Sequence, residues 1–156
     1  MTEAERAAQL ERYGSGADDV VAALDGVTDE ELDRRPPGGS WSAREVAHHL
    51  ADSESMAYIR LRRLIAEDAP VIQGYDEPEW ARRLHYDRPI EASVVVLRAV
   101  RAASLELLRS LTPDEWARTG SHSESGGYSV EQWLGIYAEH SHEHADQIRR
   151  ARRGED

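Results

Sequence analysis

The sequence predicts an all-α protein, a four-helix bundle with a long crossover connection. Four long segments place apolar residues at the helical spacings of three and four, and no segment reads as a convincing strand. One connection, over residues 70–89, is long for a loop between bundle helices. With 156 residues, the chain is expected to form one domain over residues 1–156.

The first long helix is expected over residues 4–25. Two signals follow it: a capping box at Thr28–Glu31, which opens a short helical turn, and the loop Pro36–Gly39, which ends the region. The apolar face of the long helix consists of Ala8, Leu10, Val20, Val21 and Leu24.

A second capping box, Ser42–Glu45, begins the second long helix, which continues to about Glu67 and stops before Pro70. The connection over residues 70–89 is acidic and aromatic, and we expect a short helix over residues 78–84 within it. Such a segment either covers the end of a core or carries function. The inward stripe of the long helix consists of Val46, Leu50, Ser53, Ala57, Leu61 and Leu64.

The third long helix is expected over residues 90–111. Arg101 falls within its apolar stripe, so we expect the aliphatic stem to pack there while the charged head reaches water, with a buried partner as the alternative. The rest of the stripe consists of Val94, Leu97, Val100, Leu105 and Leu108.

The last long helix begins at a capping box, Ser129–Gln132. Before it, Thr112 caps a short helix that runs through Trp116, and a loop rich in glycine and serine covers residues 119–127. The apolar residues of the long helix are Val130, Trp133, Leu134, Tyr137, Ala145 and Ile148.

Composition narrows the possible functions. The net charge of -11 makes a nucleic-acid partner unexpected, because phosphate backbones attract basic surfaces. The chain has no cysteine, which excludes disulfides, a thiolate nucleophile and zinc–thiolate sites. It also shows neither a long apolar run nor a signal-peptide pattern, so we expect a cytoplasmic protein without a membrane partner.

Histidines on two predicted helices point to a metal site. On the last helix, His140 and His144 lie about 40° apart on one face, whereas His142 lies about 200° from His140 and points elsewhere. On the second helix, His49 follows the inward stripe and His48 points away from it. A pair one turn apart is more often structural than a ligand pair, and a third inward histidine strengthens the metal interpretation.

The predicted site therefore consists of His49, His140 and His144. If the two helices run parallel, His49 and His140 lie within about 6 Å in height at the rise of an α-helix. Three neutral imidazoles suit a divalent ion such as zinc or nickel and leave one coordination position open. The candidates that would orient the imidazole rings are Glu45, Asp52 and Gln147, while His85 and His122 fall in loops.

Two segments together resemble the DinB-like superfamily. Residues 41–54, WSAREVAHHLADSE, are similar to its pattern of Trp-Ser, a glutamate and a His-Leu pair, and residues 140–148, HSHEHADQI, are similar to its closing pattern of two histidines and Gln-Ile. The segment Leu111–Trp116, with His122 and two glycines before the last helix, is also similar to the family. The resemblance covers nearly the whole chain.

This resemblance implies a four-helix bundle that binds zinc or nickel through His49, His140 and His144, and often a homodimer. It also implies a small-molecule substrate, since many members are S-transferases of low-molecular-weight thiols such as bacillithiol or mycothiol. The family leaves the positions of His48 and His142 variable.

Three functions follow. The first is a metal-dependent thiol S-transferase, for which Arg60 or Arg63 could hold an anionic cosubstrate unless both are solvated. The second is a metal-dependent hydrolase with a metal-bound water as nucleophile. The third is a non-catalytic metal-binding or stress-response protein, whose site a fourth ligand such as His122 would close.

Overall fold

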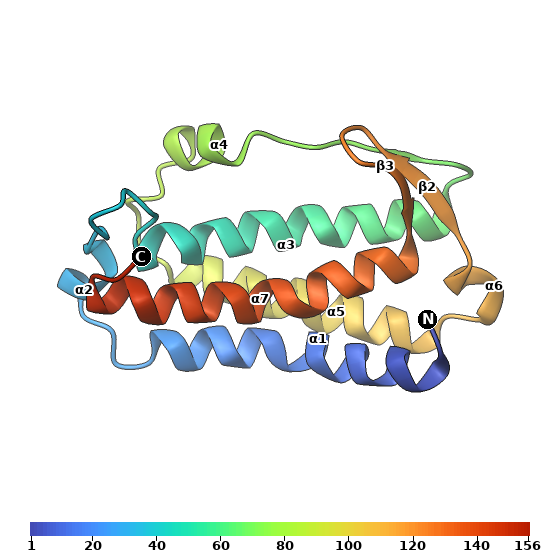
Figure 1. The fold of residues 1–156 in the computed structure, drawn as a ribbon, viewed down its shortest axis with the longest axis horizontal. Coiled ribbons are helices and arrows are strands. Elements are labelled where there is room, and N and C mark those ends of the chain that lie inside the picture. Colours follow the sequence, from blue (N-terminus) through green and yellow to red (C-terminus); the bar gives the residue numbers. More distant parts are fainter.

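The computed structural model describes residues 1–156 as a four-helix bundle with a long crossover, which confirms the predicted fold class (Figure 1). The four long helices begin within two residues of their predicted positions, and the first three also end within two residues of theirs. The elements are α1 (Glu3–Leu24), α2 (Asp29–Asp33), α3 (Ala43–Ala66), β1 (Val71–Ile72), α4 (Glu77–Arg83), α5 (Glu91–Ser110), α6 (Pro113–Trp116), β2 (Thr119–His122), β3 (Gly126–Ser129) and α7 (Val130–Arg153).

Local signals in the sequence set most helix starts. Thr28, Ser42, Thr112 and Ser129 each accept a hydrogen bond from the backbone N–H three residues later, and the side chain at that later position accepts one in return. These are the predicted capping boxes, which satisfy donors that a helix start leaves free. At the other end of α7, Gly154 takes a left-handed conformation and stops the helix.

The helices run in two directions. Helices α1 and α7 run one way, while α3 and α5 run the other, because the connection between α3 and α5 returns along the bundle (Figure 1). Helix α3 packs against α5 and α7, and α1 packs against the same two helices. The crossover runs back alongside α3, on the side of α3 that faces away from α1. It places α4 near the start of α3 (Figure 1).

The prediction that the chain has no strand is wrong. Strand β1 pairs in parallel with β2, with Val71 opposite Ser121, and β2 pairs antiparallel with β3. Strand β1 has only two residues, and β2 and β3 have four each and are rich in glycine and serine, so the strands carry no alternating apolar pattern. This small sheet fastens the start of the crossover to the hairpin that precedes α7.

A layer of buried polar residues divides the core. One apolar cluster includes Leu50, Leu97 and Ile148, and the other, toward the opposite end of the same helices, includes Leu61 and Trp133. Between the two clusters, the helices contribute polar side chains that are shielded from solvent, namely His49, Ser53, Glu54, Arg101, Ser104, Ser141 and His142. None of the helices combines the length and apolar character that a membrane span requires.

The expectation that the head of Arg101 reaches water is also wrong. Its side chain is 2% exposed and forms an ion pair with Glu54, with 2.6 Å between Nη1 and Oε1. Nη1 also donates to the Tyr137 carbonyl at 3.1 Å, and Nη2 donates to the Tyr13 carbonyl. The buried partner was therefore the correct alternative, because Glu54 occupies the facing stripe of α3.

We predict opposite effects for two Gly→Ala substitutions in helices. At Gly16, a Cβ would lie 2.7 Å from Nη2 of Arg101 and 2.9 Å from Cβ of Ser141, so Gly16→Ala should lower the free energy of unfolding by about 1–3 kcal/mol. At Gly135, where a Cβ meets nothing within 4 Å, Gly135→Ala should raise it by about 0.5–1 kcal/mol. Urea unfolding measures both, and stabilisation by Gly16→Ala would show that α1 does not approach Arg101 this closely.

Candidate metal centre

The structure brings the three predicted ligand residues together. His49 comes from α3 and His140 and His144 come from α7, and their potential ligand atoms all lie within 4.8 Å of one another. The ring centroids of His49 lie 5.7 Å from His140 and 4.8 Å from His144. One cation between the rings would thus be within reach of all three.

The two helices meet in a different orientation from the one that we considered. They run antiparallel, because His49 faces His144 while Ala57, farther along α3, accepts a hydrogen bond from Trp133, which is earlier in α7. Because the long crossover makes α5 parallel to α3, the helix that follows α5, α7, runs antiparallel to α3 (Figure 1). The site forms because the second turn of α3 lies beside the middle of α7.

Two of the imidazoles are already oriented for coordination. Nδ1 of His140 lies 3.2 Å from Oε1 of Glu54, and Nδ1 of His144 lies 2.7 Å from Oε1 of Gln147. Because a carboxylate and an amide oxygen accept, both Nδ1 atoms donate and both Nε2 atoms keep their lone pairs. Histidines that bind metals are commonly held this way, so the donor set fits a divalent transition metal.

Burial keeps two of the three histidines, His49 and His144, neutral. Burial, together with the neighbouring His144 and His140, lowers the pKa of His49 to about 3. Burial and His140 lower the pKa of His144 to about 4. The neutral imidazole is the form that binds a metal. The indole of Trp41, at 4.8 Å between centroids, covers the His49 ring.

Of the three candidates for orienting the rings, only Gln147 does so. Glu45 completes the capping box with Ser42 and pairs with Arg35 at 2.5 Å, and Asp52 accepts from the Tyr86 hydroxyl at 2.7 Å. The residue that the prediction missed is Glu54. The sequence does contain a signal for its burial, because Glu54 and Arg101 carry opposite charges and both fall within the apolar stripes of their helices.

The other histidines lie away from the site. His48 is fully buried on the far side of α3, where it bonds to the Ser93 hydroxyl at 2.7 Å and the Arg88 carbonyl at 2.9 Å. It does point away from the metal site, as predicted, but into the contact with α5. His85 is exposed after α4, and His122 packs against Tyr128 in the hairpin, so neither provides a fourth ligand.

His142 belongs to an arrangement that looks like a catalytic triad. Its Nδ1 lies 2.6 Å from Asp19 and its Nε2 lies 3.3 Å from the hydroxyl of Ser15. Nε2 also lies 3.0 Å from the carbonyl of Arg12, which can only accept. Nε2 therefore carries a proton and cannot serve as a base for Ser15, so His142 joins α1 to α7.

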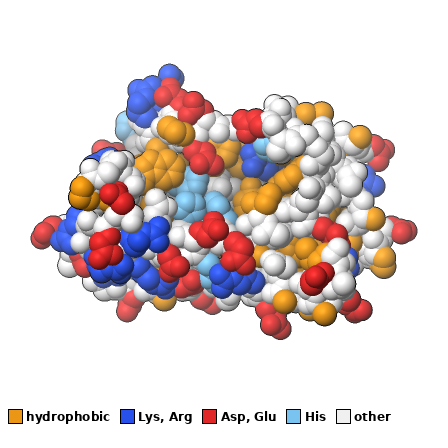
Figure 2. Space-filling model, viewed as in Figure 1, with side chains coloured by type: hydrophobic (Ala, Val, Ile, Leu, Met, Phe, Trp, Pro, Cys, Tyr) orange, Lys and Arg blue, Asp and Glu red, His pale blue; other side chains and the backbone are white.

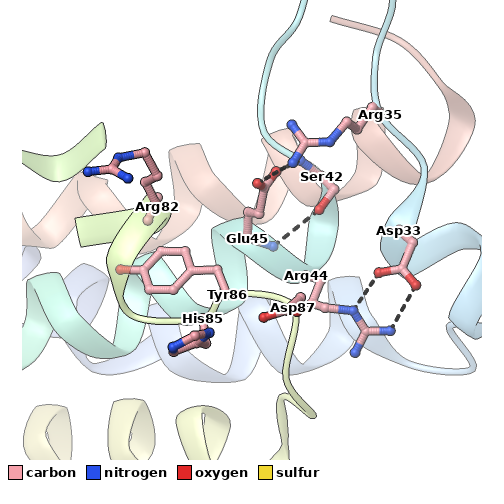
Figure 3. Close-up of a pocket in the computed structure, with 10 residues that line it drawn as sticks. Asp33, Arg35, Ser42, Arg44, Glu45, Arg82, His85, Tyr86 and Asp87 are labelled. Atoms are coloured by element: carbon pink, nitrogen blue, oxygen red, sulfur yellow. Dashed lines mark hydrogen bonds and ion pairs between the residues drawn. The ribbon is translucent and has the colours of Figure 1, made fainter. Parts of the chain in front are cut away.

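The site opens on the face that α4 overhangs. Figure 2 shows histidine side chains in the centre of this face, at the floor of a hollow. Beside it, between the start of α3 and the end of α4, lies an open cavity of about 460 Å³ (Figure 3). Its arginines are already paired, Arg35 with Glu45 and Arg44 with Asp33. Arg82, the remaining arginine, pairs with Glu79, so the cavity offers no arginine without a carboxylate partner.

The chain matches known proteins over most of its length. Residues 13–148 match the DinB superfamily. A protein of Oceanobacillus iheyensis named "Putative metal-dependent hydrolase" is 44% identical over 122 residues, covering 78% of this chain and 71% of that protein. A protein of the same description from Halalkalibacterium halodurans is 32% identical over 121 residues, covering 78% and 71%.

A solved structure shows the same fold. YfiT from Bacillus subtilis, described as "a probable metal-dependent hydrolase with an unusual four-helix bundle topology", aligns with a TM-score of 0.91 and 28% identity. The alignment covers 98% of this chain and 89% of that one.

We predict that neighbouring histidines on α3 respond differently to substitution. His49→Ala should abolish stoichiometric zinc binding, because two imidazoles hold the ion poorly. His48→Ala should keep zinc binding but lower the free energy of unfolding by about 2 kcal/mol, since it empties a buried site and leaves Ser93 unpaired. Elemental analysis and urea unfolding measure the two effects. Equal loss of zinc from both variants would contradict the assignment of faces.

Proposed function

The chain belongs to the DinB superfamily, and from this premise we propose that it is a metal-dependent S-transferase for low-molecular-weight thiols, with His49, His140 and His144 as the metal ligands. The observation that carries the proposal is the orientation of His140 and His144. Their Nδ1 atoms are bonded to Glu54 and Gln147, which leaves both Nε2 atoms without a hydrogen-bond partner and free to bind a metal.

The metal and the protein would have separate tasks. His49, His140 and His144 would hold a zinc or nickel ion, which would supply Lewis acidity and lower the pKa of a thiol. Glu54 and Gln147 hold the imidazoles in place, and Trp41 shields His49 from water. The transfer would form a bond from the thiol sulfur to an electrophilic carbon of the second substrate and break the bond from that carbon to its leaving group, while the thiol proton would pass to solvent.

The acidity of the two nucleophiles favours a thiol over water. Glu54 has a positioning role, because its Oε1 accepts from Arg101, Ser141 and Nδ1 of His140. A thiol loses its proton near pH 8.5 even without a metal, whereas free water has a pKa of about 15.7. Because the chain has no cysteine, the thiol comes from a small cosubstrate, such as mycothiol or bacillithiol.

Metal-dependent hydrolysis is the second candidate. The curated relatives from Oceanobacillus iheyensis and Halalkalibacterium halodurans are both named as hydrolases of this type. The same three histidines would serve, and the ion would lower the pKa of water instead of a thiol. This function predicts turnover of esters or amides without any added thiol.

One assay separates the two candidates. Protein loaded with zinc or nickel should consume a thiol in the presence of an electrophile from a panel, and His49→Ala, treated identically, should not. Turnover of ester substrates without thiol, also lost in His49→Ala, would favour the hydrolase instead. If neither reaction depends on His49, the proposal of an enzyme is wrong.

We also propose that the protein is a cytoplasmic homodimer. This proposal rests on its membership of the superfamily. Light scattering on the purified protein should give twice the chain mass of 17.5 kDa, and a mass equal to one chain would exclude the dimer.

A further inference from the structure

An arginine and two tyrosines lie beside the metal centre, toward the hairpin end of the bundle. The ring of Tyr137 packs against His140 with 5.6 Å between centroids, and its hydroxyl accepts a hydrogen bond from Nη1 of Arg60 at 3.0 Å. The guanidinium of Arg60 also lies 5.7 Å from the ring of Tyr75, which belongs to the crossover. One side chain, Tyr137, therefore separates Arg60 from a candidate metal ligand.

Arg60 has no carboxylate partner, although the chain contains 30 acidic residues. Besides Tyr137, its guanidinium donates only to the Gln73 carbonyl, at 2.8 Å, and its Nε is buried without any partner. By contrast, Arg63 on the same helix forms an ion pair with Glu67 at 2.8 Å. Of the two arginines that the sequence suggested for an anionic cosubstrate, only Arg60 keeps donors and charge available.

Tyr75 provides a second unused donor. Its ring stacks on Trp80 with 4.4 Å between centroids, and its hydroxyl is buried without a hydrogen-bond partner, although Ser53 lies nearby. Burial raises the pKa of this hydroxyl to about 12, so it keeps its proton at neutral pH. Buried donors without partners are rare in native proteins, and a bound ligand is one reason for them.

We propose that Arg60 and Tyr75 form a carboxylate-binding subsite beside the metal centre, so that the substrate carries a carboxylate at a distance from its reacting atom. A guanidinium binds this planar anion through parallel N–H donors, and a phenol hydroxyl adds a third. The inference rests on the proposed function, because it assumes that the reacting atom of the same substrate lies at the three histidines.

The crossover must move for the ligand to bind. Segment 73–80 lies against both donors, since it contributes the Gln73 carbonyl to Arg60 and contains Tyr75 itself. Helix α4, which continues this segment, has no buried residue. Besides its contact with Arg60, the segment is tied to the hairpin by one hydrogen bond, from the Gly74 N–H to the Ser123 hydroxyl at 3.0 Å, so little opposes its displacement. The ligand would replace the Gln73 carbonyl as a partner of Arg60.

The test compares thiols that differ only in charge. Unbranched mercaptocarboxylates of increasing chain length, each paired with its carboxamide, are titrated into cobalt-loaded protein, and the thiolate-to-cobalt absorbance reports binding. For at least one chain length, the carboxylate should bind about tenfold more tightly than its amide, as expected for hydrogen bonds to a charged group.

Three variants show which residues cause the preference for the carboxylate over the amide. Arg60→Gln should reduce it to about twofold or less without changing the affinity for the amide, and Tyr75→Phe should reduce it in part. Arg63→Gln removes the same charge from the same helix outside the subsite, so it should keep the full preference. Equal loss in Arg60→Gln and Arg63→Gln would show a general effect of charge and overturn the subsite.

Failure of the subsite can be distinguished from failure of the proposed function. If carboxylates and amides bind equally at every chain length, the subsite is wrong and the thiol function stands. If no thiol changes the cobalt spectrum, the thiol function is wrong. The subsite is then decided by NMR of the Nε–H signal of Arg60, identified by its loss in Arg60→Gln. Unbranched carboxylates without a thiol should shift it saturably, and no shift would overturn the subsite.

Discussion

All four long helices meet at one buried ion pair, between Arg101 of α5 and Glu54 of α3. The guanidinium also donates to carbonyls of Tyr13 in α1 and Tyr137 in α7, so a single side chain contacts every helix of the bundle. Removing one partner of a buried pair commonly costs about 3–5 kcal/mol, because the other charge is left without compensation. That is a large share of the about 5–15 kcal/mol that stabilises a typical domain, so the bundle depends on this contact.

The same contact sets the geometry of the candidate metal centre. Oε1 of Glu54 accepts from Arg101, from Ser141 and from Nδ1 of His140, so the position of one predicted ligand follows from the core of the bundle. Gly16 contributes from the opposite side, because the missing side chain lets α1 approach the guanidinium. The metal centre is therefore built on rigid helices whose packing already fixes the ring of His140, and a loop has no part in orienting it.

The sequence predicted the bundle, its caps and the three histidines because each of these leaves a local pattern. Helical spacing separated His49 from His48 and His140 from His142, and the structure places all four on the predicted faces. The direction of α3 relative to α7 could not be predicted, since it depends on where the crossover returns. The short sheet also left no pattern, because pairing between distant backbone segments formed it. The role of Glu54 could not be predicted from its own helix, because it depends on the ion pair with Arg101 of α5.

Arg60 and Arg101 show how the same residue type serves stability in one place and is open to binding in another. Both lie on helices of an acidic protein and both bond to tyrosines or their carbonyls. Arg101 is enclosed with a carboxylate of the chain, so its charge is compensated and is not available to a ligand. Arg60 has only neutral hydrogen-bond partners and no ion pair, so its charge is left to solvent and to the more distant Glu77, which acts on Tyr75 and Tyr137. A carboxylate that displaced this solvent would gain more binding free energy from Arg60 than from an arginine that already has an ion pair. For this reason Arg60, and not Arg101, indicates the charge of the substrate.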